Sequence, residues 1–307
     1  MAAVFWQTAL LVEIALAIAI GGPIAATAGG SPILLVLACA AALLLMQVLL
    51  VLFVTLLSRG IAGGGLRPLH TATLIMESAA LLHAALRMGV HWGICTGSHP
   101  RSGEHAGLAR SSNATPVLLI HGILCNGGIW QPLLKLLQEA GFEQVVPMNL
   151  YPLFADIEFL AEKVVAQLRA LQHDSGGRRV VIVAHSMGGL VARAALRSAG
   201  SAVIGRIVTL GTPHHGTAIA CTLPFAPTRQ MCPDSAWLRQ LNAEQEGRFD
   251  VPMTCLYSPE DTLVWPPSSA ILSGARIARV ERCGHLSLAT SQRALRLLRE
   301  ELLRERP

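Results

Sequence analysis

One stretch of sequence limits what this chain can fold into more than any other feature. From Ile33 to Leu57 the sequence is an unbroken apolar run, with no charged residue and with Gln47 as its one amide. The hydrocarbon core of a bilayer is about 30 Å thick, and about 20 helical residues cross it. A buried helix of a soluble core is the alternative, but such helices are usually shorter and show a polar face. The run therefore predicts a transmembrane helix.

The segment before this run, from Ala2 to Ile20, is also apolar but contains Glu13. A charge at the centre of a span costs about 2.5–3.5 kcal/mol, which the aliphatic residues offset if Glu13 faces the second helix. A cleaved signal peptide fits badly, because no basic residue precedes the apolar stretch. With residues 21–32 as a turn, residues 1–58 are predicted to form a hairpin of two transmembrane helices; a single span is the alternative.

The composition fits a chain of two unlike parts. Hydrophobic residues make up 52% of the chain and charged residues 14%, and Glu13 is the only charged residue before Arg59. Soluble domains carry about 25% charged residues, and disordered chains are far less hydrophobic than this one. The net charge of +5 comes from scattered basic residues that form no stripe interleaved with aromatic residues. We therefore expect no nucleic-acid partner.

Basic residues and cysteines bear on the side of the membrane that the chain occupies. Arg59, Arg67 and Arg87 follow the second apolar run and no basic residue precedes it, so the positive-inside rule predicts a cytoplasmic catalytic domain. The seven cysteines are odd in number and lack the spacing of a disulfide framework, which fits a reducing compartment. Cys221 and Cys232 bracket a short loop and would pair in an extracytoplasmic domain, but we expect two free thiols.

Residues 59–115 connect the membrane segment to the rest of the chain. The glycines at positions 63–65 break any helix that continues from the apolar run. Thr71–Met88 is rich in Leu and Ala, with Glu77 among its few polar residues, and predicts a helix. This helix either lies on the membrane surface or packs on the catalytic domain. Residues 97–115 are polar and rich in Gly and Ser, which is typical of a linker.

From Pro116 to the C-terminus, short apolar runs alternate with longer amphipathic ones. This alternation predicts a mostly parallel sheet covered by helices on both faces, which is an α/β fold. The expected strands are Val117–Ile120, Val145–Leu150, Val180–Ala184, Ile207–Leu210, Pro252–Tyr257 and Ile277–Val280. The expected helices are Ile129–Ala140, Asp156–Gln172, Met187–Ser198, Ser235–Ala243 and Leu286–Arg304.

The turn after the third expected strand reads Ala-His-Ser-Met-Gly-Gly, with the serine at position 186. A serine on a sharp strand-to-helix turn needs small neighbours, and Ala184 and Gly188 are small. Ala184 stands where the G-x-S-x-G pattern has its first glycine, which adds one methyl group. The helix that begins at Met187 points its backbone N–H groups toward the place where an oxyanion would form. The pattern predicts Ser186 as a nucleophile.

Three loops supply the remaining parts of such a site. His121-Gly122-Ile123 follows the first strand, where the Ile123 N–H is expected to join that of Met187 in an oxyanion hole. Asp261 lies in the loop after a late strand, and His285 follows the last strand. The chain order Ser, Asp, His is the order that a hydrolase of this architecture requires.

On these motifs the segment from Pro116 onward resembles the α/β-hydrolase superfamily, and within it the bacterial lipase and esterase group. The run Leu210–Thr217, LGTPHHGT, and the segment PVLLIHGILCNGGIW at residues 116–130 are similar to those enzymes as well. The resemblance implies that Ser186 is the nucleophile, His285 the general base and acid, and Asp261 the residue that orients the imidazole. The departures are Ala184 and a short lid, and the lid argues against interfacial activation.

Other residues compete for these roles. His121, His185, His214 and His215 compete with His285, but each lies at a position that does not fit the required chain order. Asp250 and Glu260 compete with Asp261; the first precedes the strand, and the second comes one residue early. Cys125 has no activating partner in this template.

The lid segment Ala218–Phe249 is expected to bear on the substrate. Its short helix has an apolar face that includes Trp237, and this face either lines the pocket or packs on the core. We expect the substrate to contact His121, Gly122, Trp130 and Trp237. No cluster of metal ligands and no phosphate-binding glycine loop is visible, so we expect no metal and no cofactor.

These features together predict a membrane-anchored serine hydrolase that cleaves carboxylic esters, with lipid acyl esters as substrates and the bilayer as its partner. The expected location is a membrane, the bacterial inner membrane. Two alternatives stay open. An acyltransferase or thioesterase would use the same triad, and a non-catalytic membrane accessory protein would use the same scaffold. The oligomeric state is not predicted.

Overall fold

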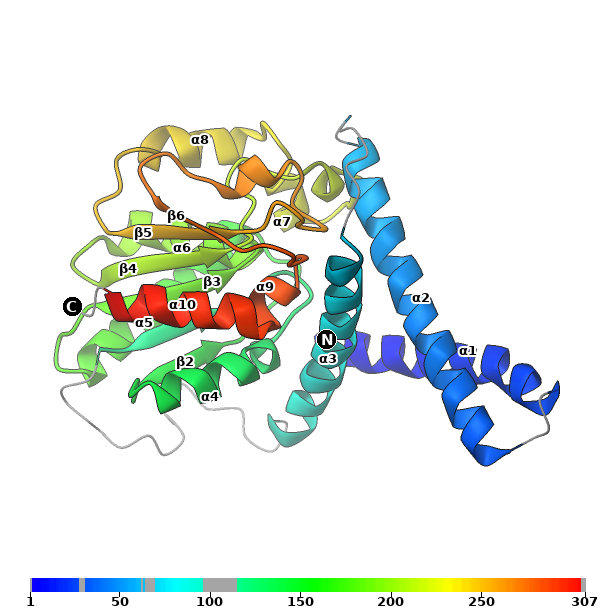
Figure 1. Cartoon of the computed structure of the whole chain (residues 1–307). Coiled ribbons are helices and arrows are strands. Elements are labelled where there is room, and N and C mark those ends of the chain that lie inside the picture. The colour runs from blue at the N-terminus through cyan, green and yellow to red at the C-terminus, as the bar shows by residue number, and fades with distance from the viewer. Residues whose placement is uncertain (1, 28–30, 62, 64–69, 96–114, 305–307) are drawn as a thin grey trace.

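The protein divides into three N-terminal helices and a domain built on one sheet, which lie side by side (Figure 1). This computed structural model describes residues 2–27, 31–61, 63, 70–95 and 115–304. Most of the predicted linker at residues 97–115 lies outside the described residues. The sheet domain begins at β1, Val117–Ile120, next to the predicted boundary at residue 116.

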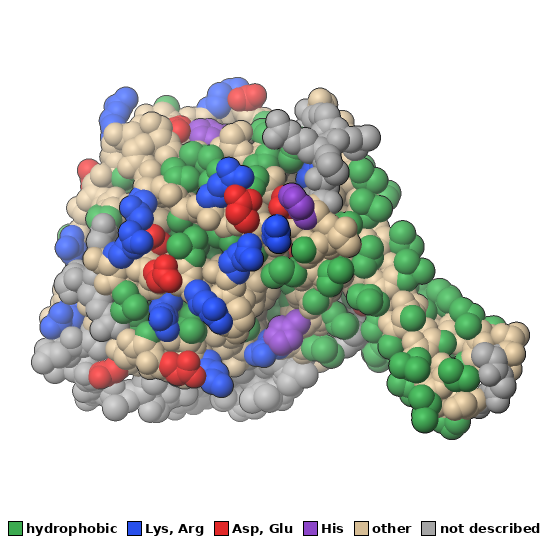
Figure 2. All heavy atoms as spheres, viewed as in Figure 1, with side chains coloured by type: hydrophobic (Ala, Val, Ile, Leu, Met, Phe, Trp, Pro, Cys, Tyr) green, Lys and Arg blue, Asp and Glu red, His purple; other side chains and the backbone are tan. Residues whose placement is uncertain are grey.

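Two N-terminal helices, α1 (Ala2–Thr27) and α2 (Pro32–Ile61), pack against each other as a hairpin. By length and composition alone, Gln7–Thr27 and Pro32–Ile61 could each cross a membrane. Apolar side chains make up much of the visible surface of this hairpin (Figure 2). Many of these large apolar side chains are exposed to solvent, among them Leu11, Ile18, Ile33, Val36 and Phe53.

A hydrogen bond and a close backbone approach are among the contacts that hold α1 on α2. Gln47 Nε2 donates a hydrogen bond to Glu13 Oε2 at 2.6 Å, so Glu13 faces the second helix as its burial requires. A Cβ on Gly21 would lie 2.7 Å from the backbone nitrogen of Cys39, so a glycine lets the two backbones approach. The prediction that the turn begins at Gly21 was wrong, because α1 continues to Thr27 through Pro23. A helix satisfies the backbone groups of an apolar segment better than an open turn does.

The third helix, α3 (Thr71–Cys95), packs on the sheet domain, which settles the alternative left open by the sequence. Ala84 and Met88 are buried in the same apolar cluster as Leu119 of β1. Asn126, in the loop after β1, donates from Nδ2 to the backbone oxygen of Met88 at 3.0 Å. The helix also runs beyond its predicted end at Met88. It is therefore part of the core of the sheet domain.

The sheet has six parallel strands in the order β2-β1-β3-β4-β5-β6. Chain direction across the sheet reverses between β1 and β3, and ligands of open α/β sheets bind at the carboxyl ends of the strands beside this point. Ile120 pairs with Ala184 and His185 pairs with Leu210, so the ends of β1, β3 and β4 lie side by side. The strands after β1 are β2 (Val145–Met148), β3 (Val180–His185), β4 (Ile204–Leu210), β5 (Met253–Tyr257) and β6 (Arg276–Arg279).

Helices cover both faces of the sheet, as alternate residues of one strand show. Leu118 and Leu119 of β1 are both buried, but they belong to two different apolar clusters. The first cluster includes α5 (Ile157–Asp174), α6 (Met187–Ala199) and α8 (Ala236–Gln245), and the second includes α4 (Gln131–Glu139) and α10 (Gln292–Arg304). The remaining helical turns are η1 (Gly127–Trp130), η2 (Ala218–Thr222), α7 (Ala226–Gln230), η3 (Pro267–Ala270) and α9 (Ser287–Thr290). The predicted α/β fold is confirmed.

The C-terminal helix differs from its prediction. Instead of one helix from Leu286 to Arg304, the structure has α9 and α10 with a break at Ser291. Ser291 has an extended backbone, and its hydroxyl accepts a hydrogen bond from Ala294 N at 3.3 Å. Serine is a good helix cap because its side chain satisfies a free backbone N–H. A new helix therefore begins where the sequence pattern continued.

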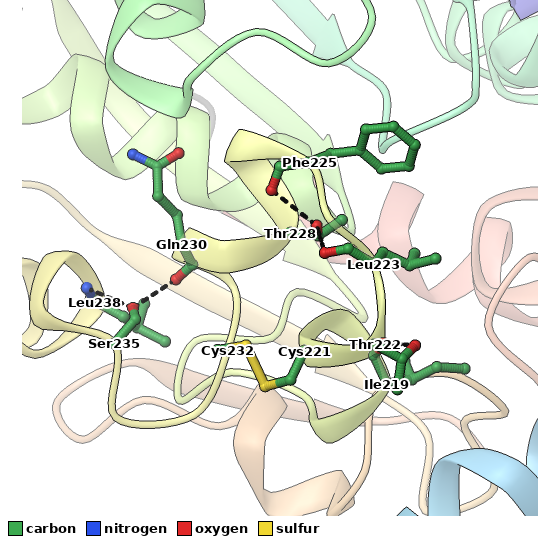
Figure 3. Close-up of a disulfide and its surroundings, with 10 residues drawn as sticks. All are labelled: Ile219, Cys221, Thr222, Leu223, Phe225, Thr228, Gln230, Cys232, Ser235 and Leu238. Carbon is green, nitrogen blue, oxygen red and sulfur yellow. Dashed lines mark hydrogen bonds between the residues drawn. A yellow bond between two sulfur atoms is a disulfide. The ribbon is translucent and has the colours of Figure 1, made fainter.

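A disulfide joins Cys221 to Cys232, so the expectation of two free thiols was wrong (Figure 3). The two Cα atoms lie 5.1 Å apart, which is within the range of bridged cysteines. The bond ties η2 to the turn after α7 and closes a short loop of the lid segment. The two cysteines meet because the lid segment folds back on itself. Their separation of 11 residues in the sequence does not by itself predict this turn.

Candidate active site

Ser186 lies on a strained turn between β3 and α6. Its backbone has φ 57° and ψ −130°, a conformation that costs a non-glycine residue of order 1–3 kcal/mol. The turn is held because Ser186 N donates to Leu210 O at 2.9 Å and Gly189 N donates to Ser186 O at 3.0 Å. This geometry lifts the hydroxyl above the carboxyl ends of the strands, as a nucleophile requires.

Glycines give this turn its room. A Cβ on Gly188 would lie 2.6 Å from the backbone oxygen of His121, and a Cβ on Gly122 would lie 2.7 Å from Cβ of Ser186. Real Cβ atoms essentially never come this close to a neighbour, so a side chain at position 188 would displace backbone and one at position 122 would displace Ser186. The loop after β1 therefore lies directly against the serine.

The structure brings the three predicted triad residues together. Nε2 of His285 lies 2.9 Å from Oγ of Ser186, and Nδ1 of the same ring lies 3.0 Å from both carboxylate oxygens of Asp261. All three side chains are buried. Asp261 is held in turn by the backbone N–H groups of Leu263 and Val264, at 2.9 and 2.8 Å from Oδ1. These are the contacts that a base between a nucleophile and an orienting acid makes.

The charges around His285 favour its protonated form. Burial lowers the pKa of the imidazole, but the Asp261 carboxylate, its hydrogen bond and the charge of Glu77 together outweigh burial and raise this pKa above 6.5. A base with a raised pKa accepts the serine proton more readily, and it is active only above that pKa.

The two predicted oxyanion donors lie on different segments near the serine. Met187 follows Ser186 in the chain, and Ile123 belongs to the loop after the neighbouring strand β1. Met187 is the first residue of α6, so its N–H is not used by the helix ladder. Ile123 follows Gly122, which lies against Ser186. Their role as donors stays a prediction.

Three of the four predicted substrate contacts are occupied elsewhere. His121 is buried; its Nδ1 contacts Gly122 O at 2.8 Å and its Nε2 accepts from Leu150 N at 3.0 Å. Burial lowers its pKa to about 4. Trp130 is fully buried in the apolar core. Trp237 donates from its indole to Glu158 Oε1 at 2.6 Å, and the helix that carries it packs on the core. The fourth, Gly122, does lie at the serine.

The other competing histidines also have partners away from Ser186; His215, for one, contacts Ile271 O through Nε2 at 3.1 Å. His185 donates from Nε2 to the backbone oxygen of His285 at 3.0 Å, and burial lowers its pKa to about 3. His214 is buried beside Thr209 and the Arg193 guanidinium, and burial lowers its pKa well below 6.5. Neither is placed to take a proton from Ser186. Burial also raises the pKa of the Cys125 thiol to about 12, so this cysteine is not a nucleophile.

The competing acid Glu260 has its partners at the start of α3, and His285 is not among them. Its carboxylate accepts hydrogen bonds from Thr73 and from His70 N, the second at 3.2 Å, and pairs with His70 Nδ1 at 3.1 Å. It therefore joins the Asp261 loop to the start of α3. Among the residues that the structure describes, no group of three or more His, Cys, Asp or Glu could hold a metal ion.

One acidic residue at the site escaped the sequence analysis. Glu77 of α3 is buried beside the loop that carries His285 and accepts hydrogen bonds from Leu286 N at 2.7 Å and Ser287 N at 2.9 Å. The only sequence signal was an isolated acid in an apolar helix, which does not reveal its partner more than 200 residues away.

The six parallel strands, the helices on both faces and the Ser-His-Asp arrangement at the carboxyl ends of the strands are those of the α/β-hydrolase fold. A model of the alpha/beta hydrolase family matches residues 117–265. The predicted resemblance to this superfamily is confirmed.

Solved structures of lipases share the fold. The Aspergillus fumigatus lipase B structure superposes with a TM-score of 0.62 at 18% identity, covering 88% of this chain and 81% of that one. The mature form of Bacillus licheniformis lipase BlEst2 gives a TM-score of 0.54 at 16% identity, covering 65% of this chain and 94% of that one. No curated protein matches the sequence. At these identities the likeness concerns the fold.

Proposed function

We propose that this protein is a serine hydrolase that cleaves carboxylic esters, with Ser186, His285 and Asp261 as its triad. The observation that carries the proposal is the chain of contacts from Ser186 Oγ through the His285 ring to Asp261, at 2.9 and 3.0 Å. A serine in a strained elbow, bonded to a histidine that an acid orients, is the arrangement of an activated nucleophile.

The reaction follows from these positions. Ser186 Oγ attacks the ester carbonyl carbon while its proton passes to His285 Nε2, and the Asp261 carboxylate stabilises the imidazolium. The N–H groups of Ile123 and Met187 bind the oxyanion. His285 then returns the proton to the departing alcohol, which leaves an acyl group on Ser186. A water molecule, deprotonated by His285, attacks this acyl-enzyme, and the acid and the free serine are released.

Lipid acyl esters are the proposed substrates. The support is of two kinds: the fold is shared with lipases, and two apolar helices are attached to the catalytic domain. A membrane hairpin would hold the site close to acyl chains. That argument concerns where the enzyme works, and the chemistry of the triad is the same for any ester.

Two observations favour opposite sides of the membrane for the catalytic domain. The three arginines after the second apolar run favour the cytoplasm, as the positive-inside rule states. The disulfide between Cys221 and Cys232 favours an oxidising compartment. Protease treatment of intact spheroplasts distinguishes them, because only a domain outside the cytoplasm is digested before the membrane is opened.

A fluorophosphonate ester probe tests the proposed function. This probe reacts only with a serine whose base and oxyanion hole are assembled. We expect it to label the wild type, in membranes and in detergent, and not to label the folded Ser186→Ala variant. If the folded wild type is not labelled in either medium, the protein is not a working serine hydrolase.

A further inference from the structure

Glu77 places a buried carboxylate beneath the two catalytic loops. It is 3% exposed and lies on α3, outside the segment that the sequence pattern assigned to catalysis. Its oxygens accept from two consecutive backbone N–H groups, those of Leu286 and Ser287, which follow the catalytic histidine directly. A carboxylate with two charge-assisted hydrogen bonds to one backbone turn restrains that turn strongly.

The same carboxylate reaches the loop that carries the catalytic acid. Thr262, the residue after Asp261, donates from Oγ1 to Glu77 Oε1 at 3.2 Å, and this hydroxyl accepts from His285 N at 3.2 Å. The loops after β5 and β6 are thereby joined through one side chain. Any shift of Glu77 moves the backbone on which His285 is mounted and the residue beside Asp261.

The Glu77 carboxylate is also closely packed against the loop that carries His285. A Cβ on Gly284 would lie 2.4 Å from Cδ of Glu77, so the carboxylate lies against the backbone on the other side of the histidine. The carboxylate therefore packs against the residue before His285 and accepts hydrogen bonds from the two residues after it. This is more restraint than filling a space requires.

We propose that Glu77 is a positioning residue for the catalytic histidine, so that the helix after the membrane hairpin completes the active site of the sheet domain. The inference rests on the proposed function, because it assigns His285 the role of the base. Glu77 does not contact the reacting atoms; it acts through the loop of His285 and through its charge.

The charge of Glu77 makes the inference measurable. Among the residues that the structure describes, Asp261 contacts the His285 ring, and the His185 ring lies beside it at 4.8 Å between centroids. The charge of Glu77 also acts on the His285 ring. His185 is neutral at working pH, since burial lowers its pKa to about 3. Asp261 and Glu77 both raise the pKa of His285. Burial raises the pKa of Glu77 itself, and the hydrogen bonds from Leu286 N and Ser287 N oppose this. Where the Glu77 carboxyl is ionised, removing its charge lowers the pKa of His285, and the base becomes active at a lower pH.

The test compares three variants of the full-length protein in detergent: Glu77→Gln, Glu77→Ala and Ser78→Ala. Glutamine keeps the shape and one acceptor oxygen but loses the charge, whereas alanine loses every contact. Ser78 is the matched control, because it is also buried on α3 and its hydroxyl donates to Leu74 O of its own helix, at 2.8 Å. Thermal unfolding monitored by circular dichroism establishes that each variant is folded.

We expect Glu77→Gln to lower kcat for a soluble ester about tenfold, the effect of one weakened charge-assisted contact, with KM changed less than about twofold. The acid limb of its kcat/KM profile moves to lower pH. Glu77→Ala lowers kcat about 100-fold, as expected for a misplaced catalytic group. Ser78→Ala keeps the wild-type kcat and profile.

A Glu77→Gln enzyme with wild-type kcat and an unmoved acid limb overturns the inference, even if it melts at a lower temperature, because only a structural role would remain. If Glu77→Ala does not fold, Glu77→Gln decides alone. NMR titration of the His285 imidazole in the wild type and in Glu77→Gln separates this inference from the proposed function. If the wild type shows no turnover, the proposed function fails. If the pKa of the His285 imidazole is the same in the wild type and in Glu77→Gln, the inference about Glu77 fails, whether or not the protein hydrolyses esters.

Discussion

The two halves of the proposed active site are held in different ways. Ser186 is fixed by neighbours within the sheet: the ends of β1, β3 and β4 and the glycines that pack against them. Asp261 and His285 lie on loops that contact residues N-terminal to the sheet. Glu77 of α3 accepts hydrogen bonds from both loops. The nucleophile half is thus built by the fold itself, and the acid–base half depends on the N-terminal helices.

Further contacts support this difference. Ser58, near the end of α2, donates to Leu263 O at 3.1 Å, and the Arg59 guanidinium lies 4.6 Å from the ring centre of Trp265. Thr73 and His70 bind Glu260. The loop that carries Asp261 therefore touches the end of the α1–α2 hairpin and the start of α3. An α/β-hydrolase domain cut out at residue 116 would lack all of these contacts.

The largest expected effect lies in the nucleophile half. Ser186→Ala should lower ester turnover by about 10⁴-fold or more while leaving the fold intact, because members of a triad act as a unit. Steady-state hydrolysis of a chromogenic short-chain ester measures the loss, and thermal unfolding checks the fold. Turnover that survives in a pure sample would remove Ser186 from the mechanism.

The second effect tests the room around the serine. Gly188→Ala places a methyl group 2.6 Å from His121 O and 2.7 Å from Ile120 O, and backbone must shift to accept it. We expect a loss of about 1–3 kcal/mol in the free energy of unfolding and a large loss of probe labelling. Denaturant unfolding and the labelling rate measure the two. Gly60→Ala is the control, since a Cβ there meets nothing within 4 Å; equal behaviour of the two variants would contradict the prediction.

The third effect tests the acid–base half with two truncations. Removing residues 1–69 keeps Glu77 and α3, whereas removing residues 1–115 takes away both and uncovers the core that Ala84 and Met88 seal. In detergent we expect the longer form to be labelled by the probe and the shorter form to be slower by about 100-fold or to aggregate. A shorter form that is soluble and reacts at the rate of the longer one would show that the sheet domain needs no helix before residue 116.

The same comparison explains what the sequence could predict. The strand-to-helix turn that carries Ser186 was recognisable because the residues that define it are close together in the sequence: Ala184, Ser186 and Gly188 lie within one turn. The six strands were visible as separate apolar runs. Asp261 and His285 were proposed as triad partners from chain order within a known architecture, because the loops after β5 and β6 each contain a suitable residue.

What escaped prediction depends on contacts between distant segments. Glu77 bonds to Ser287, 210 residues later in the chain, and nothing near either residue announces the pairing. Trp130 and Trp237 were expected at the substrate. Trp130 is instead buried in the core, and the Trp237 indole donates a hydrogen bond to Glu158. The disulfide required the lid to fold back on itself. Periodicity and motifs describe local structure, and these features are tertiary.

The smallest effect concerns Glu260, the acid beside Asp261. Its pairing partner His70 is 65% exposed, so the pair is weak, and Glu260→Gln should reduce the free energy of unfolding by about 0.5–1 kcal/mol. Burial raises the pKa of this carboxyl, but hydrogen bonds from Thr73 and His70 outweigh burial and hold it below 4.5. Stability from a depressed carboxyl pKa is present above the unfolded-state value and is lost as the pH falls through the folded-state value. The wild type and Glu260→Gln should therefore differ in stability at pH 7 and converge in acid, as urea unfolding at several pH values will measure. A difference that persists unchanged below the carboxyl pKa would show that the ionised Glu260 does not hold the Asp261 loop to α3.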